Sequence, residues 1–309
     1  MGIAAPSVGL GQGRQLRPWH WPQLVWDFLR RWPVIPVAVL AMLIVVAIFA
    51  PWLAPFDPVK QSLVRSHVPP VWVTHYYAQN PEVETHILGT DRFGRDVLSR
   101  VIHGARISLM LASISMTTGV VIGAWAGLAA GYYGGLLDEF LTRFVDVWNA
   151  MPFLLVALVV SVTIGQGIII MIALLVALTW VGMVRNVRAE VLTLKERDYV
   201  ALARVAGASD LRILLRHILP GVLNLLMIMA SLRVGGLILT EASLSFLGVG
   251  VPSHIPTWGI MINDGRQFLA TAWWVSVFPG LGIFLTVMSM NFLGDWVRDR
   301  TDPRLRQVR

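Results

Sequence analysis

The stretch that decides the fold is Val147–Val184, which reads VWNAMPFLLVALVVSVTIGQGIIIMIALLVALTWVGMV and contains no charged residue. A helix needs only about 20 apolar residues to cross the hydrocarbon core of a bilayer, so this run is too long for one crossing. The Gly-Gln-Gly triplet at 165–167 divides it, because glycines and a polar amide are typical of a turn. The stretch therefore predicts two membrane spans, one ending near Ile164 and the next beginning near Ile168.

The composition of the 309-residue chain points the same way. Hydrophobic residues make up 56% and charged residues 14% of the chain, and its mean hydropathy is +0.66. A soluble domain carries about 25% charged residues, so this chain has too few to cover a solvated surface. Composition thus excludes an ordinary soluble enzyme and a disordered chain. A polytopic membrane protein remains.

Four more apolar stretches have the length of a membrane span. They are Val34–Ala54, a segment within Ile107–Leu137, Gly221–Glu241 and a segment within Trp273–Val297. The expected fold class is therefore an all-α integral membrane protein with six transmembrane helices. An even number of spans places both termini on the same side of the membrane.

The basic residues indicate which side that is. They concentrate before the first span, between the fourth and fifth spans, and after the sixth span, as cytoplasmic segments do. Both termini are therefore expected in the cytoplasm. The residues concerned are Arg14, Arg17, Arg30, Arg31, Arg185, Arg188, Lys195, Arg197, Arg204, Arg212, Arg216, Arg298, Arg300, Arg304, Arg306 and Arg309.

This topology predicts three regions along the chain. Residues 1–32 form a cytoplasmic tail whose aromatic and apolar residues have the spacing of a short interfacial helix. Residues 33–297 form the transmembrane domain, and 298–309 form a cytoplasmic tail. The transmembrane domain includes outer loops at 55–105 and 242–272 and a cytoplasmic loop at 185–219.

The second span carries glycines at a regular spacing of four residues. Four residues turn an α-helix by about 400°, so the members of such a series lie on nearly the same face. Small residues on one face allow two helix backbones to approach closely within a membrane. The series predicts a close helix contact, either a sliding one or a static packing seam, at Gly119, Gly123, Gly127 and Gly131.

Charged residues in or near the spans are candidates for a solute path. A charge at the bilayer centre costs about 2.5–3.5 kcal/mol, so it needs a partner or water. Arg143 and Asp146 belong to a polar face of the third span, and the spacings Glu139–Arg143 and Arg143–Asp146 permit ion pairs. Arg233 and Glu241 bracket the outer part of the fifth span. All four are candidates for an aqueous path, and the alternative for the last two is that Glu241 marks the membrane edge and Arg233 forms a structural pair.

The chain shows no sign of catalysis of its own. It contains no cysteine, which excludes a thiol nucleophile and a Cys-based metal site. Neither lysine, Lys60 or Lys195, follows a glycine as in a P-loop, and no HExxH or GxSxG occurs. The histidines of the first outer loop lack metal-ligand spacing, so no metal site is expected. The net charge of +7 follows membrane topology, so no nucleic-acid partner is expected either.

The cytoplasmic loop Val191–Pro220 reads VLTLKERDYVALARVAGASDLRILLRHILP. A helix is predicted up to Ala206, and Gly207 provides the left-handed residue that commonly ends a helix. Ser209 is a favourable N-cap for a second helix, which leads through Pro220 into the fifth span. An exposed helix held in this way is either a docking site for another protein or an interfacial helix lying on lipid.

Part of this loop resembles a known family. ALAxxxG at 201–207, followed by HILP at 217–220, is similar to the EAA loop of ABC importer permeases. The family's usual Glu is Ala201 here and its usual Ile is His217, whereas the Gly and Leu-Pro positions are kept. The resemblance implies docking of an ATPase, without a charged contact at position 201. Coupling to the ATPase is thereby assigned to Tyr199, Ala201, Ala203, Gly207, Ala208, Ser209, Asp210, Leu219 and Pro220.

Further stretches narrow the resemblance to the C-type permease subunits of dipeptide, oligopeptide and nickel ABC importers. They are LGTDRFGRDVLSR at 88–100, EASLSFLG at 241–248 and PTWG at 256–259. The family implies a type I ABC importer permease fold with a coupling helix near Lys195–Ala206. It also implies that the chain forms half of a peptide pore in the bacterial inner membrane, with glutathione or a nickel complex as alternative substrates.

The resemblance also implies a set of partners. These are a second homologous permease subunit forming a heterodimer, two cytoplasmic ATPase subunits, a periplasmic solute-binding protein and membrane lipid. The chain itself would bind no cofactor, because ATP and Mg²⁺ are bound by the ATPases. The main alternative is a stand-alone secondary transporter or channel, although the two halves of the sequence show no clear inverted repeat. A membrane-embedded enzyme is the third possibility, but the sequence contains no catalytic constellation.

Two features are expected in the outer loops. Asp91 is a candidate N-cap for an amphipathic helix on the outer membrane surface. The apolar face of that helix would be Phe93, Val97, Leu98, Val101 and Ile102. Between the fifth and sixth spans, a semi-rigid loop with Pro252, Pro256 and Trp258 is a candidate contact for the solute-binding protein, by family analogy.

Overall fold

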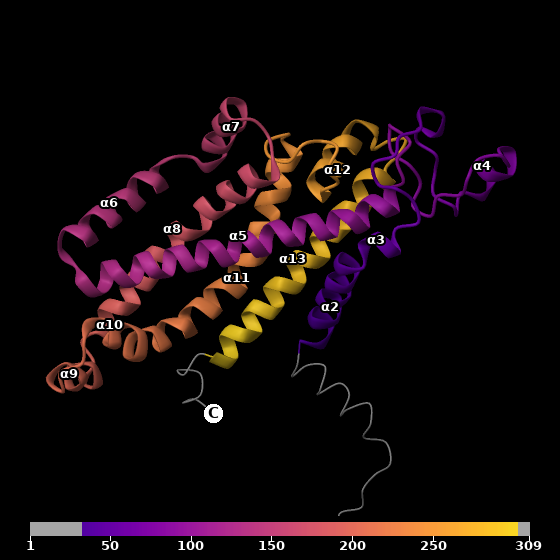
Figure 1. The fold of residues 1–309 in the computed structure, drawn as a ribbon. Coiled ribbons are helices and arrows are strands. Elements are labelled where there is room, and N and C mark those ends of the chain that lie inside the picture. Colours follow the sequence, from indigo (N-terminus) through magenta and orange to yellow (C-terminus); the bar gives the residue numbers. More distant parts are fainter. Residues whose placement is uncertain (1–32, 302–309) are drawn as a thin grey trace, which may run out of the picture.

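The computed structural model describes residues 33–301, and regular structure in that range is helical apart from one isolated bridge between Thr90 and Asp96. Figure 1 shows long helices lying side by side, with short helices and loops at both ends of the bundle. The expected interfacial helix within 1–32 and the last residues of the C-terminal tail lie outside the described residues. The labelled helices are α2 (Val34–Ile48), α3 (Ala50–Leu53), α4 (Thr74–Gln79), α5 (Val97–Tyr133), α6 (Gly135–Ala150), α7 (Phe153–Thr163), α8 (Ile168–Leu194), α9 (Asp198–Val205), α10 (Asp210–Ile213), α11 (Leu219–Phe246), α12 (Trp258–Gly265) and α13 (Trp274–Thr301).

Four helical segments are long and apolar enough to cross a membrane. They are α5, α8, the continuous segment Asp210–Phe246 that contains α11, and α13, and they correspond to the predicted second, fourth, fifth and sixth spans. The predicted third span is the pair α6 and α7, which are bent by 85° at a break. The predicted first span is α2, which has 15 residues and continues after a break into α3. The helical membrane class is thus confirmed, and two of the six predicted spans are interrupted.

Prolines explain both interruptions. Pro51 follows the break at Phe49, and its ring nitrogen has no hydrogen to donate within the helix. Pro152 separates α6 from α7, and Met151 before it has φ −87° and ψ 129°, the extended conformation favoured before proline. The uncharged sequence around Pro152 gave no other sign of a bend. The break predicted at 165–167 is confirmed, because α7 ends at Thr163 and α8 begins at Ile168.

The second span begins earlier than expected. α5 starts at Val97, so four of the residues assigned to a separate surface helix, from Val97 to Ile102, form the first turns of the span itself, and the fifth, Phe93, lies in the turn before it. The N-cap is Asp96 and not Asp91, because the Asp96 carboxylate accepts a hydrogen bond from the backbone N–H of Ser99 at 2.7 Å. The prediction of a separate amphipathic helix capped by Asp91 is therefore wrong.

Asp91 instead closes a tight turn before α5. Its Oδ1 accepts hydrogen bonds from the backbone N–H groups of Phe93 and Arg95, both at 2.9 Å. Gly94 within this turn has φ +70°, a left-handed conformation that suits glycine and interrupts a helix. The glycine explains why the polar pattern at 91–95 does not form a helical turn.

The predicted glycine series of α5 lies against α8. A β-carbon at Gly123 would be 2.5 Å from the β-carbon of Met183, closer than side chains approach one another. β-Carbons at the other three glycines would be 2.6–2.8 Å from β-carbons of α8 that recur at the same four-residue spacing. The glycines therefore allow the two backbones to pack along a continuous seam. The facing pairs are Gly119 with Thr179, Gly127 with Val187 and Gly131 with Val191.

α12 is a short helix inserted between the ends of longer ones. Trp258 at its start is 1% exposed, and its indole Nε1 donates a hydrogen bond to the carbonyl oxygen of Val101 at 3.1 Å. Gly104 on α5 makes room for the ring, because a β-carbon there would lie 2.9 Å from the indole. Trp258 thus anchors this loop to the bundle, and the expectation that its side chain is available to a binding protein is wrong.

Candidate functional site

The chain between α8 and α11 has the predicted helix–corner–helix form. α9 follows the end of α8 at Leu194, and α10 begins at Asp210. We call Lys195–Asp210 the coupling segment. Figure 1 shows it at the end of the bundle opposite α12.

Gly207 forms the corner of the coupling segment. Its φ of +78° lies in the left-handed region. Its N–H donates to the carbonyl oxygen of Arg204 at 3.0 Å, and the N–H of Ala208 donates to that of Ala203 at 3.1 Å. These two bonds are those of a Schellman motif. A β-carbon at Gly207 would meet nothing within 4 Å, so the backbone conformation, and not crowding, requires the glycine.

One face of the coupling segment is buried in the core of the bundle. Val200 has no exposed surface, and it belongs to the same apolar cluster as Ile213, Ile218 and Val222 of the helical path that follows. Ala203 packs partly against this cluster. Because these contacts join α9 to the start of the next span, α9 is seated on the bundle and is not a loose loop.

The opposite face of α9 is exposed and largely apolar. Leu202 is 68% exposed, Val205 87% and Tyr199 44%. Ala201 lies on the exposed part of the helix as well. Apolar side chains gathered on one exposed surface are typical of a contact with another macromolecule. The arrangement fits a short helix laid into a groove of a partner protein.

Two hydrogen bonds tie the coupling segment to the end of α5. The Tyr132 hydroxyl donates to Asp210 Oδ1 at 2.7 Å. Lys195 Nζ donates to the carbonyl oxygen of Gly131 at 3.2 Å. Both ends of the segment are thereby attached to the helix that packs along α8. A force on α9 would reach α5, α8 and α11 together.

One predicted residue of this region, Ser209, differs in detail from expectation, whereas Pro220 continues the helix as predicted. Ser209 occupies the N-cap position of α10, but its side chain makes no capping hydrogen bond. Pro220 lies within the continuous helical path Asp210–Phe246, directly after a π-helical turn at Leu214–Ile218. The wider turn accommodates a proline that has no N–H for the helical ladder. Leu219 is half-buried, so the fifth span begins as a rigid extension of α10.

The four charged residues predicted for a solute path do not lie together. Glu241 has no exposed surface, and it accepts hydrogen bonds from the hydroxyls of Ser108 at 3.0 Å and Ser245 at 2.8 Å. Arg233 is exposed, and its guanidinium covers Gly182 of α8. In this conformation Glu241 joins α5 to α11 and does not reach the surface.

Arg143 and Asp146 lie on an exposed polar face of α6. Arg143 is 3.4 Å from Glu139, the ion pair that their spacing permits. Asp146 pairs with Arg185 of α8 at 2.7 Å instead of with Arg143. Both residues line a cleft of about 310 Å³ between α6 and α8. Their role in a solute path stays a prediction.

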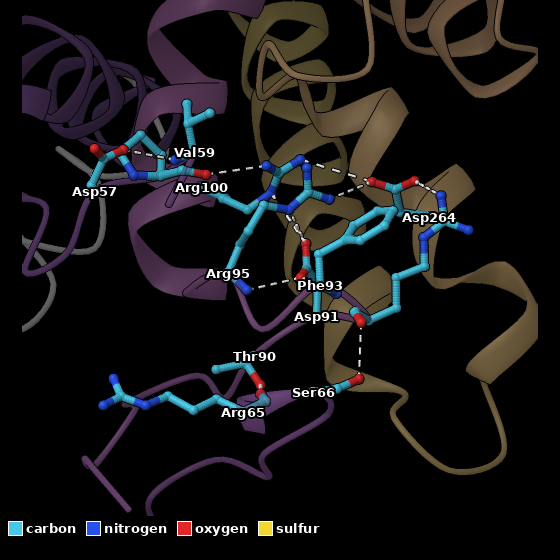
Figure 2. Close-up of polar contacts among 12 residues, drawn as sticks. Asp57, Val59, Arg65, Ser66, Thr90, Asp91, Phe93, Arg95, Arg100 and Asp264 are labelled. Atoms are coloured by element: carbon cyan, nitrogen blue, oxygen red, sulfur yellow. Dashed lines mark hydrogen bonds and ion pairs between the residues drawn. The ribbon is translucent and has the colours of Figure 1, made fainter. Parts of the chain in front are cut away.

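A buried ionic cluster lies near α12, at the other end of the bundle (Figure 2). Arg95 donates hydrogen bonds to Asp91 at 2.6 Å and to Asp264 at 2.9 Å. Arg92 donates to Asp264 at 3.0 Å, and Arg100 lies 3.7 Å from Asp91 and 3.9 Å from Asp264. Apart from Arg92, all members are buried. The cluster joins the loop before α5 to α12.

The described residues 33–301 contain no group of three or more His, Asp or Glu side chains arranged to hold a metal ion. What the fold offers is a bundle of membrane helices with a short, exposed and largely apolar helix at one end. That arrangement defines the class of a membrane-embedded subunit that works with an attached protein.

Sequence families identify this class further. The model of the family described as "Binding-protein-dependent transport system inner membrane component" matches residues 119–307. A second model, "N-terminal TM domain of oligopeptide transport permease C", matches residues 23–70. The chain belongs to the family of inner-membrane components of binding-protein-dependent transport systems. It is a multi-pass C-type permease subunit of an ABC importer, a system that works through an ATPase and a solute-binding protein.

Two relatives are similar over most of their length. The chain is 38% identical to the di/tripeptide transport system permease protein DppC of Pseudomonas aeruginosa, covering 87% of this chain and 88% of that protein. It is 40% identical to the glutathione transport system permease protein GsiD of Escherichia coli, covering 98% of this chain and 95% of that protein.

A solved structure confirms the fold. The inward-facing MetNI methionine ABC transporter matches with a TM-score of 0.50 at 20% sequence identity, over 66% of this chain and 96% of that one. The expected type I importer permease fold is therefore confirmed.

Proposed function

We propose that this chain forms one half of the translocation pore of an ATP-driven importer of short peptides. The observation that carries the proposal is the coupling segment, whose exposed apolar face stands at the junction of α8 and α11. The relatives described as transporting di/tripeptides and glutathione, itself a tripeptide, support a short-peptide substrate.

This role implies the other subunits of the transporter. A second, homologous permease forms the other half of the pore, and two ATPase subunits dock on the two coupling segments. ATP and Mg²⁺ bind to the ATPases, and this chain binds no cofactor and catalyses no reaction. A solute-binding protein delivers peptide at the α12 end. Both termini lie in the cytoplasm and the helices span the inner membrane.

The structure suggests how the ATPases would act on the pore. ATP-driven closure of the ATPases displaces α9, and the buried Val200 carries the displacement into the helical path that becomes α11. The hydrogen bonds from Tyr132 and Lys195 carry it into α5. Such a displacement changes access to the pore by moving packed helices between two arrangements.

Reconstitution of the complex into proteoliposomes tests this function. With the second permease, the ATPases and the loaded binding protein present, labelled dipeptide should accumulate with ATP and not with a non-hydrolysable analogue. Labelled glutathione in a parallel assay identifies the preferred peptide class. Uptake by this chain alone, driven by an ion gradient, would overturn the proposal in favour of a stand-alone secondary transporter.

A further inference from the structure

α6 is attached to the bundle differently from the long helices around it. Val145 is its one buried residue, and it packs against Val181 and Val184 of α8, with partly exposed aromatic contacts at Trp148 and between the Phe144 and Trp180 rings, whose centroids are 5.8 Å apart. Phe140 and Val147 on other faces of α6 are 66% and 64% exposed. Little apolar burial therefore fixes the position of α6 on α8.

At both ends of α6 the backbone can change direction. Gly134 and Gly135, which connect it to α5, have φ values of +66° and +60°, and β-carbons at either position would meet nothing within 4 Å. Two successive glycines in open space permit backbone rotation that other residues resist. At the far end, the break at Met151 and Pro152 turns the helix axis by 85°. α6 is thus a helix between two positions at which the chain can change direction.

Two ion pairs connect α6 to α8. The guanidinium of Arg188 donates hydrogen bonds from two of its nitrogens to the Asp138 carboxylate, and the bond from Nη2 to Oδ2 measures 2.7 Å. Arg185 Nη2 donates to Asp146 Oδ1 at 2.7 Å. Both arginines lie in the last part of α8, which runs directly into the coupling segment after Leu194. The ion pairs therefore connect α6 to the stretch of α8 nearest α9.

We propose that Asp138 and Arg188, supported by Asp146 and Arg185, are positioning residues that transmit movement of the coupling segment to α6. A two-nitrogen contact between guanidinium and carboxylate fixes both distance and direction, so α6 must follow α8. The apolar contact around Val145 lacks the directional geometry of such an ion pair. The proposal rests on the proposed function, because it requires an ATPase that moves the coupling segment.

The exposure of these pairs fits positioning better than stabilisation. The Arg185 and Asp146 side chains are 60% and 56% exposed, and those of Arg188 and Asp138 are 32% and 19% exposed. Neither pair is enclosed in the core of the chain, so changing one residue leaves no fully buried charge without a partner. They can therefore be altered without unfolding the bundle, and α6, which carries the polar face with Glu139 and Arg143, can change its position during transport.

The test uses the complete complex in proteoliposomes and measures peptide transported per ATP hydrolysed. Asp138→Asn and Arg188→Gln should each assemble and hydrolyse ATP, yet lower this ratio at least fivefold. The exchanged double variant Asp138→Arg/Arg188→Asp should recover much of it, because the pair is restored with reversed charges. The control Glu84→Gln removes an exposed ion pair with Arg65 outside α6 and should leave the ratio unchanged.

A distance measurement reports the movement itself. Spin labels on Phe140→Cys of α6 and Trp125→Cys of α5 occupy exposed positions in a chain without native cysteine. The distance between the labels should shift when nucleotide is added to the parent complex, and this shift should be lost in Asp138→Asn.

The possible outcomes separate this inference from the proposed function. A parent complex without ATP-dependent uptake overturns both. If the parent is ATP-driven and the neutral variants keep its ratio and its distance shift, the transmission role is overturned while the function stands. If the neutral variants fail to assemble, the pairs are structural and the inference is likewise overturned.

Discussion

Gly207 and Asp264 show how single residues determine larger arrangements. Gly207 adopts φ +78°, which lets α9 end and α10 begin within a few residues. The Asp264 carboxylate neutralises arginines that precede α5 or lie in its first turn, although it lies far along the sequence in α12. One residue acts through backbone conformation and the other through charge. Each makes a prediction at its own position.

Replacement of Gly207 should reveal a purely conformational requirement. Gly207→Asn should keep transport coupled to ATP hydrolysis, whereas Gly207→Val should uncouple it. A left-handed conformation costs most residues about 1–2 kcal/mol, Asn tolerates it, and a β-branched residue resists it most. Both complexes should assemble, because a side chain at this position meets open space. The measurement is peptide uptake per ATP hydrolysed, and equal coupling in both variants would contradict the role of the corner.

Neutralising Asp264 should destabilise the α12 end. In Asp264→Asn, the buried Arg95 and Arg100 would lose a balancing carboxylate, and breaking a buried ion pair costs about 3–5 kcal/mol. Glu84→Gln, which removes an exposed ion pair, should cost only about 0–1 kcal/mol. Thermal unfolding of the purified complex measures both effects. Equal unfolding temperatures for the two variants would show that the cluster does not hold this end together.

At the scale of the element, apolar runs predicted where the helices lie better than how they bend. Every expected span has a helical counterpart, because length and hydropathy suffice to locate a membrane helix. The bend at Pro152 was missed, because a proline within an apolar run is compatible with a straight or a broken helix. The surface helix capped by Asp91 was predicted wrongly, because the sequence does not show that Gly94 adopts a left-handed turn.

For contacts between elements, the sequence indicated one of the two contacting surfaces but not the other. The glycine series marked one face of α5, but nothing in the spacing identified α8 as the helix that covers it. Arg95 and Asp91 have the spacing of an ion pair, yet the second carboxylate that pairs with Arg95, Asp264, comes from a distant segment. The helix α9 and its corner at Gly207 were predicted, because both depend on local sequence, whereas docking of an ATPase on α9 stays a prediction.

The glycine seam gives a prediction about helix packing. Gly123→Leu should impair assembly of the complex, because its β-carbon would overlap Met183 and overpacking costs about 1–3 kcal/mol. Val121→Leu adds one methylene group on an exposed face and should have little effect. Size-exclusion chromatography of the purified complex and its unfolding temperature compare the two. Normal assembly of Gly123→Leu would mean that α5 and α8 separate more readily than their contact indicates.

At the scale of the whole molecule, α8 connects the elements to which the proposed function assigns movement. It packs along α5 through the glycine seam, meets α6 through two ion pairs, and leads into the coupling segment. The buried cluster near α12 holds the other end of the bundle in place. This division is compatible with the proposed function, in which the ATPases act at one end and solute enters at the other.

The proposed orientation predicts which end of the molecule faces each side of the membrane. The chain has no native cysteine, so a single introduced cysteine can be labelled selectively. Ser209→Cys in the coupling segment should react only with a reagent that reaches the cytoplasm. Gln79→Cys at the end of α4 should react with an impermeant reagent added outside. Labelling of both positions from one side would contradict the topology.

The most direct test of the account is whether the exposed face of α9 touches an ATPase. Leu202→Cys, at a 68% exposed position, should cross-link to a cysteine on the ATPase surface, with a yield that changes when nucleotide binds. Gln79→Cys should give no such cross-link under the same conditions. If neither Leu202→Cys nor Val205→Cys cross-links in a complex that imports peptide with ATP, the coupling segment is not the site of ATPase docking.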